Sequence, residues 1–287
     1  MKKILITGAT GFIGNHLIQA YLAQTKYHII ATSRDMQKAR EYPWFHQVTY
    51  IPYTIESSIK NNNLYDYFEK PDLLIHLAWE GLPNYTDLLH LEKNLFNHYD
   101  FLKNLVINGL KKVTVTGTCL EYGQQDGCLR EEIRTQPSNA YAIAKDTLRK
   151  FIEQLSLLYA FEYKWIRLFY MHGHGQAEHS LLSLLEKAIK QQAKEFNMSQ
   201  GEQLRDYLHI SDVVKNIMLI CSQNLFTNQA INCCSGEPIS VRHLVEQYLH
   251  DNQYSLKLNL GHYAYPSYES MAFWGDNSKL NIIRGKV

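Results

Sequence analysis

Tyr141 and Lys145 are the first residues in this chain whose types and spacing could do chemistry. They stand four positions apart in the segment SNAYAIAKD, so a helix would bring both side chains to one face, one turn apart. A phenol with a free pKa of about 10 needs a neighbouring cation to bring that pKa closer to working pH, and the ammonium of Lys145 supplies one. Together they could move a proton to or from a carbinol oxygen, whereas alone either would be ordinary packing or helix surface.

The strand-like segment KVTVTGT adds a hydroxyl to this pair. Such a run is typical of a buried parallel strand. Its last residues, Thr116 and Thr118, would reach the carboxyl edge of the sheet, where ligands bind in doubly wound folds. We therefore expect Thr118, Tyr141 and Lys145 to form the catalytic set.

The segment ILITGATGFIGNHL carries the pattern of a dinucleotide-binding turn. Gly8, Gly11 and Gly14 follow a strand and lead into a helix, so backbone N–H groups and the helix N-terminus can face a pyrophosphate. Strand, glycines and helix in this order favour cofactor binding over a plain glycine-rich turn. The residues expected to hold the cofactor here are Gly8, Thr10, Gly11, Phe12, Ile13 and Gly14.

The end of the next strand, HIIATSRD, indicates which dinucleotide is bound. Arg34 follows this strand, where it could pair with a 2′-phosphate, and Ser33 could add a hydrogen bond. Asp35 is the alternative, since an acid at this place bonds the ribose hydroxyls of NAD(H). We expect NADP(H) to be preferred and NAD(H) to be possible.

Short β-rich runs alternate with helical patterns through the first two thirds of the chain. This order predicts an α/β fold, a Rossmann-like doubly wound parallel sheet with a smaller C-terminal lobe. Residues 1–170 are expected to form the NAD(P)-binding domain, with later segments interleaved, and residues 171–287 to form mainly the lobe. The expected strands are 2–7, 27–33, 48–53, 72–78, 112–118 and 163–171, and the expected helices start at Phe12 and Tyr141 or lie near 91–108, 179–194, 211–222 and 241–250.

The composition excludes several classes of function. With 29 Lys and Arg against 28 Asp and Glu, the formal charge of +1 gives no basic field for nucleic acid. No apolar run approaches the roughly 18 to 20 residues that span a bilayer, and the N-terminus lacks a cleavable signal pattern, so we expect a cytoplasmic protein without membrane contact. Five scattered cysteines indicate reduced thiols. His172, His174 and His179 lack a metal-binding pattern, so no metal is expected.

Several motifs in order resemble one known family. TGATGFIG, LLIHLA, GTCLEYG and YAIAK, followed by IRLFYMHGHG, LRDYLHISDVV, INCCSGEPISV and GDNSKL, are similar to the extended short-chain dehydrogenase/reductase family, in particular its nucleotide-sugar epimerases, dehydratases and 4-ketoreductases. The resemblance implies that Tyr141 is the catalytic acid/base and that Thr118 holds the reacting oxygen. It implies that Lys145 lowers the pKa of Tyr141 and holds the nicotinamide ribose. The residues it adds to the cofactor site are Leu77, Ala78, Asn94, Tyr141 and Lys145.

The residues after Thr118 separate the activities within this family. Its 4,6-dehydratases carry an Asp–Glu pair there, whereas this chain has Cys119 and Leu120, and leucine cannot transfer a proton. Arg34 favours a reductase that consumes NADPH over an epimerase that keeps NAD bound. We therefore expect reduction of the 4-keto group of a dTDP-, CDP- or GDP-linked 4-keto-6-deoxysugar, in deoxysugar and surface polysaccharide biosynthesis. The alternatives are a nucleotide-sugar epimerase and a non-catalytic dinucleotide sensor. The sequence offers no account of Glu121.

The resemblance also implies a nucleoside diphosphate sugar bound between the sheet domain and a substrate-binding C-terminal lobe. Arg205 matches the family arginine that pairs with the diphosphate, and an ion pair with Asp206 is the alternative. Tyr170 stands where the family usually has asparagine, and His172 where it usually has tyrosine. The residues expected to contact the substrate are Trp79, Asn84, Tyr85, Thr118, Tyr170 and Arg205.

A homodimer is the expected assembly. Relatives in this family commonly pack two helices of each subunit into a four-helix bundle. The apolar spacings in LFNHYDFLKNLV and LRKFIEQLSLLY would permit this, although the same residues could face the sheet instead.

Overall fold

The apolar runs of the first two thirds of the chain form most of one seven-stranded sheet. The computed structural model describes residues 1–56, 63–265 and 270–285. The strands of this sheet are β1 (Lys2–Thr7), β2 (Tyr27–Thr32), β3 (Thr49–Tyr50), β4 (Leu73–His76), β5 (Lys112–Thr118), β7 (Glu162–Leu168) and β11 (Gln229–Cys233). They lie in the order β11-β7-β5-β4-β1-β2-β3, and neighbouring strands are parallel throughout.

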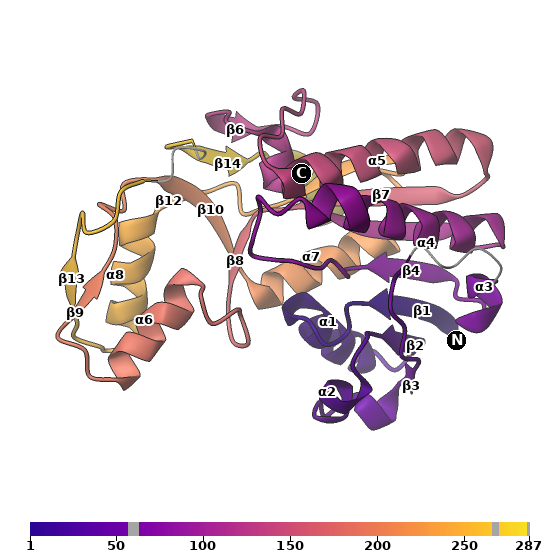
Figure 1. Ribbon diagram of the computed structural model, residues 1–287, viewed down its shortest axis with the longest axis horizontal. Coiled ribbons are helices and arrows are strands. Elements are labelled where there is room, and N and C mark those ends of the chain that lie inside the picture. The colour runs from indigo at the N-terminus through magenta and orange to yellow at the C-terminus, as the bar shows by residue number, and fades with distance from the viewer. Residues whose placement is uncertain (57–62, 266–269, 286–287) are drawn as a thin grey trace.

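Helices cover both faces of this sheet (Figure 1). The helices next to it are α1 (Phe12–Leu22), α4 (Leu95–Ile107), α5 (Ala140–Leu158) and α7 (Ile210–Ser222). Side chains alternate along β1, so Ile4 and Ile6 pack with α1 and α7 on one face, while Leu5 packs with α4 and α5 on the other. The predicted doubly wound parallel sheet is therefore confirmed.

The other helices are short or lie in the C-terminal lobe. The predicted helices near 179–194 and 241–250 correspond to α6 (Leu181–Lys190) and α8 (Val241–Asp251), which pack together through Leu185 and Val245. The remaining helices are α2 (Met36–Arg40), α3 (Leu64–Tyr67) and α9 (Ser278–Ile283), with one-turn segments at Phe45–Gln47, His90–Asn94 and Cys119–Tyr122. None of the helices in the described part of the chain is long and apolar enough to cross a membrane.

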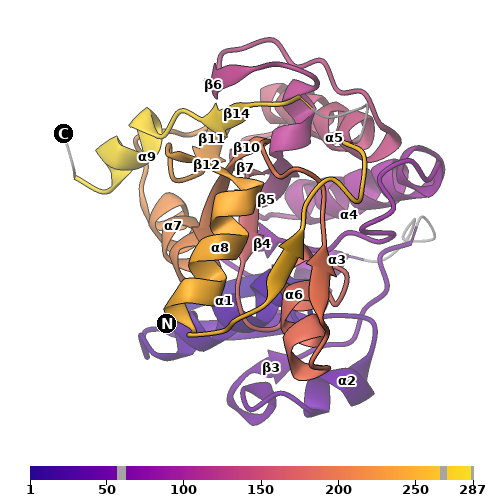
Figure 2. The ribbon, with the colours of Figure 1, turned by 90° about the vertical axis from the view of Figure 1, so that its left-hand side faces the viewer.

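Small sheets build the rest of the molecule, most of them beside α6 and α8 (Figure 2). They are β8 (Tyr170–His172) with β10 (Leu204–His209) and β12 (Pro238–Ser240), β9 (Glu195–Asn197) with β13 (Lys257–Asn259), and β6 (Gly127–Leu129) with β14 (Phe273–Gly275). The division of the chain at residue 170 stays a prediction, and β11 and α7 are later segments that lie with the large sheet.

Candidate active site

The glycine turn after β1 brings backbone segments unusually close together. Gly8 has a φ of 69°, and a Cβ atom there would lie 2.9 Å from the backbone nitrogen of Ala78. A Cβ atom on Gly14 would lie 2.2 Å from the carbonyl oxygen of Gly8, so glycine is needed for α1 to approach the turn. Gly11 is the N-cap of α1 and places no side chain over the helix N-terminus. The turn therefore offers the open backbone surface that a pyrophosphate requires.

A cavity of about 420 Å³ opens beside this turn, between the ends of β1, β2 and β4. The predicted cofactor residues that line it are Gly8, Thr10, Gly11, Ser33, Arg34, Ala78 and Asn94. The sequence reasoning missed the wall residues Thr7, Thr32, Lys38, Tyr53, Ile55, Glu80 and His98. Most of these come from segments that carry no motif, so only the folded sheet brings them together.

Six predicted cofactor residues are not among the described wall residues of this cavity. They are Phe12, Ile13, Gly14, Leu77, Tyr141 and Lys145. The side chains of Phe12 and Ile13 are half-buried and pack against the apolar core between β1, α1 and α7. Tyr141 and Lys145 contact Trp79, a predicted substrate residue that does line the cavity.

Arg34 and Asp35 are both engaged with protein groups. The Arg34 Nη1 atom lies 2.5 Å from Oε1 of Glu80, another wall residue. The Asp35 Oδ1 atom accepts a hydrogen bond from the Lys38 backbone nitrogen at 3.0 Å and so caps α2. A cofactor with a 2′-phosphate would therefore have to draw Arg34 away from Glu80.

The three predicted catalytic residues come together where β5 ends and α5 begins. Thr118 is the last residue of β5, and its Oγ1 atom accepts a hydrogen bond from the Leu120 backbone nitrogen at 3.2 Å. The Asn139 side chain caps α5 by accepting from the Ala142 backbone nitrogen at 2.9 Å. This start of α5 brings Tyr141 within hydrogen-bonding reach of Thr118.

Lys145 is a buried cation held by a carbonyl group and an aromatic ring. Its Nζ atom donates to the Thr116 carbonyl oxygen at 2.8 Å and lies 4.1 Å from the centroid of the Trp79 ring. Burial lowers the pKa of Lys145 to about 7, and the negative charge of Glu121 opposes that change. Lys145 can therefore exchange its proton near neutral pH.

Tyr141 is buried among aromatic rings. Its ring centroid lies 5.5 Å from that of Tyr85 and 5.4 Å from that of His90. Burial raises the pKa of Tyr141 and the neighbouring Tyr85 raises it further, while a hydrogen bond with Thr118 lowers it in part. The expectation that Lys145 brings this pKa down is not met in this structure, because the loss of water around the phenol dominates. Tyr141 therefore holds its phenolic proton at neutral pH and has one to donate.

Two histidines that the sequence analysis missed hold Trp79 in place. The Trp79 Nε1 atom donates to Nδ1 of His90 at 3.1 Å, which makes His90 Nε2 the donor to the Asn84 carbonyl oxygen at 2.8 Å. The Trp79 ring stacks on His98 with the centroids 4.6 Å apart. Trp79 is thus fixed between the 420 Å³ cavity and Tyr141, and Asn84 contributes a backbone carbonyl to this arrangement.

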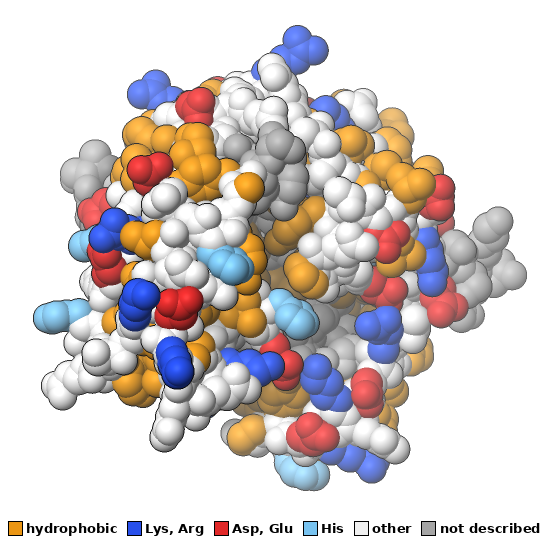
Figure 3. Space-filling view, turned by 60° about the vertical axis from the view of Figure 1, so that its left-hand side comes forward, with side chains coloured by type: hydrophobic (Ala, Val, Ile, Leu, Met, Phe, Trp, Pro, Cys, Tyr) orange, Lys and Arg blue, Asp and Glu red, His pale blue; other side chains and the backbone are white. Residues whose placement is uncertain are grey.

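Two further, adjacent cavities lie at the C-terminal lobe and are together called the groove of this lobe. Tyr85 and Tyr170, both predicted to contact the substrate, line the smaller cavity of about 330 Å³. The larger cavity of about 620 Å³ is lined by residues of the C-terminal lobe and shares His179 and Leu181 with the smaller one, so the two are adjacent. In the space-filling view, histidine and hydrophobic side chains surround a hollow on this face (Figure 3).

Arg205 is not among the described wall residues of these three cavities. Its side chain is buried, its Nη1 atom donates to the Leu204 carbonyl oxygen at 2.9 Å, and its guanidinium lies 4.6 Å from the centroid of the Phe273 ring. Asp206 accepts a hydrogen bond from the Gly236 backbone nitrogen at 2.9 Å. A diphosphate would have to change these surroundings to reach Arg205, so its role stays a prediction.

A protein-family model described as the NAD dependent epimerase/dehydratase family matches residues 4–234. The chain belongs to this family. The predicted family resemblance is thereby confirmed. The family is NAD dependent by its description, so the expectation of a nicotinamide dinucleotide as cofactor is also confirmed. The comparisons give no support to a preference for NADP(H).

Individual relatives are similar to most of the chain. A dTDP-6-deoxy-L-talose 4-dehydrogenase (NAD(+)) from Aggregatibacter actinomycetemcomitans is 29% identical over 276 residues, covering 95% of this chain and 99% of the relative. A dTDP-4-dehydro-6-deoxyglucose reductase from Escherichia coli is 25% identical over 260 residues, covering 85% and 79%. The solved UDP-glucuronic acid 4-epimerase from Bacillus cereus, in complex with UDP-glucuronic acid and NAD, has a TM-score of 0.83 at 21% identity and covers 99% of this chain and 93% of that chain.

The histidines near the groove complete the description of this family member's site. His172 and His179 line the smaller cavity, and the His174 carbonyl oxygen bonds to His16 at 2.8 Å. Within the described residues, no group of three or more His, Cys, Asp or Glu side chains could hold a metal ion.

Proposed function

We propose that this chain reduces the 4-keto group of a nucleotide-linked 4-keto-6-deoxysugar with NADH or NADPH. The observation that carries this proposal is the position of Tyr141, which is buried beside Thr118 with its ring against Trp79, a wall residue of the glycine-turn cavity, and Tyr85, a wall residue of the groove. Two relatives named above act, by their names, on the 4-position of a dTDP-linked 6-deoxyhexose, one as a 4-dehydrogenase and one as a reductase of the 4-dehydro sugar.

The residues of the site divide the reaction between them. A nicotinamide dinucleotide, when bound against the glycine turn, supplies the hydride that adds to the keto carbon. Thr118 holds the keto oxygen by a hydrogen bond, and Tyr141 transfers its phenolic proton to that oxygen as the hydride arrives. The product is a secondary alcohol, and Tyr141 is left as a phenolate. Lys145 stabilises the phenolate by its charge and can pass on a proton, because its pKa is about 7.

A dehydratase is not proposed, because the two positions directly after Thr118, residues 119 and 120, carry no acid. Cys119 is buried, and Leu120 offers only its backbone N–H, which bonds to Thr118 Oγ1. Because the leucine side chain cannot transfer a proton, the pair of acids that would move protons at C5 and C6 of the sugar is not present at these positions.

The cofactor preference belongs to the same proposal. Arg34 and Lys38 line the cavity, and the Asp35 carboxylate is engaged in capping α2, which favours binding of a 2′-phosphate. Glu80 opposes it, because it holds Arg34 and would repel the phosphate. We propose that both dinucleotides are accepted and that Arg34 shifts the preference towards NADPH.

The test is to follow the absorbance band of the reduced nicotinamide while the purified protein receives 4-keto-6-deoxysugars linked to dTDP, CDP or GDP. Consumption of NADH or NADPH with one of them is the expected result. The absence of consumption with all three, together with tightly bound NAD released on denaturation, would replace the reductase by an epimerase.

The substrate is proposed to lie in the groove with its sugar against Tyr85 and Tyr170 and its nucleotide towards the 620 Å³ cavity.

The homodimer also remains part of the proposal. Exposed apolar side chains on α4 and α5, among them Phe96 and Leu157, support it, and light scattering at micromolar concentration would test it.

A further inference from the structure

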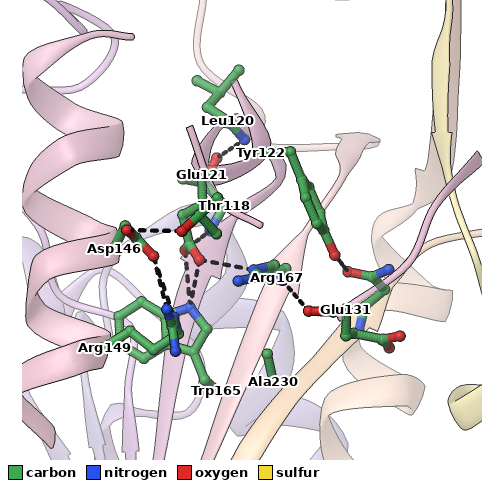
Figure 4. Close-up of polar contacts among 12 residues, drawn as sticks. Thr118, Leu120, Glu121, Tyr122, Glu131, Asp146, Arg149, Trp165, Arg167 and Ala230 are labelled. Atoms are coloured by element: carbon green, nitrogen blue, oxygen red, sulfur yellow. Dashed lines mark hydrogen bonds and ion pairs between the residues drawn. The ribbon is translucent and has the colours of Figure 1, made fainter. Parts of the chain in front are cut away.

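Glu121 is a fully buried acid in the turn that carries Thr118, and the mechanism above does not use it. Its carboxylate lies between the end of β5 and strand β7 (Figure 4). A buried carboxylate is costly unless it is hydrogen bonded and paired with a cation. Its partners therefore indicate what the acid does.

One partner of this carboxylate closes the turn itself, and a second partner fixes the turn to the neighbouring strand β7. Glu121 Oε1 accepts from the Thr118 backbone nitrogen at 2.9 Å, and both carboxylate oxygens accept from Trp165 Nε1, at 2.9 and 3.1 Å. The Thr118 hydroxyl accepts in return from the Leu120 backbone nitrogen, so the turn is a reciprocal capping box. Thr118 is thus held twice, through its backbone N–H by Glu121 and through its hydroxyl by the Leu120 N–H.

A third partner neutralises the charge. Arg167 Nε donates to Glu121 Oε2 at 2.8 Å, and its Nη1 atom donates to the Glu131 carbonyl oxygen at 3.2 Å. The guanidinium also lies 4.5 Å from the centroid of the Tyr122 ring. Because both charged side chains are buried, their attraction is little screened by water or salt.

Gly117 makes room for this arrangement. A Cβ atom at that position would lie 2.1 Å from Trp165 Nε1 and 2.3 Å from Glu121 Oε1. The backbone of β5 must therefore remain bare at Gly117 for the carboxylate to reach the Thr118 N–H group.

The charge of Glu121 also acts on the catalytic pair. It raises the pKa of Lys145 against the larger lowering by burial, and it adds to the burial that raises the pKa of Tyr141. Lys145 faces His76 from β4 and His98 from α4, but burial keeps the pKa of both imidazoles low, and that of His76 is about 3. Both histidines are therefore neutral near pH 7, and they do not replace the negative charge of Glu121.

We propose that Glu121 is a positioning residue for the reduction: its carboxylate fixes the Thr118 hydroxyl and places a negative charge beside Tyr141 and Lys145, with Arg167 as counterion. This inference rests on the proposed function for the roles of Thr118, Tyr141 and Lys145. It assigns no contact between Glu121 and the substrate.

The direct test is the titration of Lys145 in the full chain, followed by NMR of protein labelled at the lysine ε-carbons. The Lys145 signal is identified by its loss in Lys145→Met. In Glu121→Gln the midpoint should fall by about one pH unit, because the ammonium loses a nearby negative charge while Arg167 remains. An unchanged midpoint in folded Glu121→Gln would overturn the proposal.

Two further variants separate charge from structure. In Glu121→Gln/Arg167→Gln both charges are absent, so the midpoint should return towards the wild-type value; a midpoint that stays low would show that altered packing, not charge, causes the change. If Glu121→Gln does not fold, Arg167→Gln keeps the carboxylate without its counterion. The Lys145 midpoint should then rise, and a fall or no change would contradict the proposal.

Activity provides the second readout. Glu121→Gln should lose about 10²-fold in kcat, with its pH profile moved to lower pH and little change in dinucleotide affinity. A loss of kcat with an unmoved profile would overturn the electrostatic part. The Lys145 titration needs no substrate, so a protein that reduces none of the 4-keto sugars would refute the proposed function without deciding the role of Glu121.

Discussion

Lys145 and Arg167 are buried cations close to the Thr118 turn, and both are only 2% exposed. Burial alone would lower the pKa of either side chain. Arg167 contacts the carboxylate of Glu121, and its pKa is raised despite burial. Lys145 has a carbonyl oxygen and an indole face as neighbours, and its pKa falls to about 7. The difference shows that contact with an acid outweighs burial at Arg167, whereas burial dominates at Lys145 and leaves it able to exchange its proton near neutral pH.

The largest expected effect concerns Tyr141, the proton donor that lies beside the catalytic cation Lys145. Tyr141→Phe removes the proton donor and should lower kcat by about 10²- to 10⁴-fold, while dinucleotide affinity stays close to wild type. Stopped-flow absorbance of the reduced nicotinamide would measure the first, and fluorescence titration the second. If Tyr141→Phe retained most of the activity, Tyr141 would not be the proton donor, and the catalytic role given to Lys145 beside it would also fall.

The two cations should differ strongly in what they contribute to stability. Arg167→Met leaves the Glu121 carboxylate buried without its counterion and should lower the free energy of unfolding by about 3–5 kcal/mol. Lys145→Met should lose no more than about 1 kcal/mol at neutral pH, the net worth of its hydrogen bond to Thr116. Urea unfolding of the two variants would measure both values. Equal losses would mean that Lys145 is as firmly paired as Arg167.

The pH dependence of stability sharpens the same contrast. Since the pKa of Lys145 is about 7 in the folded chain against 10.5 ordinarily, the unfolded chain binds more protons between these values. The free energy of unfolding of wild type, relative to Lys145→Met, should therefore rise as the pH increases from about 7 to 10.5. Lys190→Met, which removes an exposed lysine on α6, is the matched control and should show no such rise relative to wild type. A flat difference for Lys145→Met would contradict its lowered pKa.

Arg34 extends the comparison to an exposed cation that also contacts an acid. Its pair with Glu80 should contribute little to stability, about 0–1 kcal/mol. Arg34→Ala should instead weaken NADPH binding about tenfold or more relative to NADH, because it removes a charged donor to the 2′-phosphate. Isothermal titration with both dinucleotides would measure this ratio, and Arg40→Ala on α2 is the control outside the cavity walls. Equal weakening of both cofactors would disprove the role of Arg34.

The parts of the site that lie close together in the sequence were predictable. Gly8, Gly11 and Gly14 form one turn, and Tyr141 and Lys145 lie on one helix face, so local geometry alone fixes their relation. The doubly wound sheet could also be predicted, because buried parallel strands carry continuous apolar runs. The helices α6, α7 and α8 were predicted to within a few residues by their apolar periodicity.

The missed contacts depend on pairings between distant segments. Glu121 meets Arg167 across two neighbouring strands, 46 residues apart in the chain, and no local pattern indicates that meeting. His90, Asn94 and His98 follow one another at intervals of four residues, so a helix brings all three to one face. This spacing was the one sequence pattern that could have indicated the histidines that hold Trp79. The pairing of β6 with β14 joins segments from the middle and the end of the chain, beyond the reach of periodicity.

The bare backbone at Gly117 has a consequence for how this site can change between related chains. Because a side chain there would occupy the place of the Glu121 carboxylate, the two positions cannot vary independently. A related chain with a side chain at position 117 would have to displace both the Trp165 indole and the Glu121 carboxylate, and one that keeps both groups in place must keep the glycine. Across an aligned set of relatives, glycine and glutamate four positions apart should therefore be inherited as a unit, together with an arginine on the neighbouring strand.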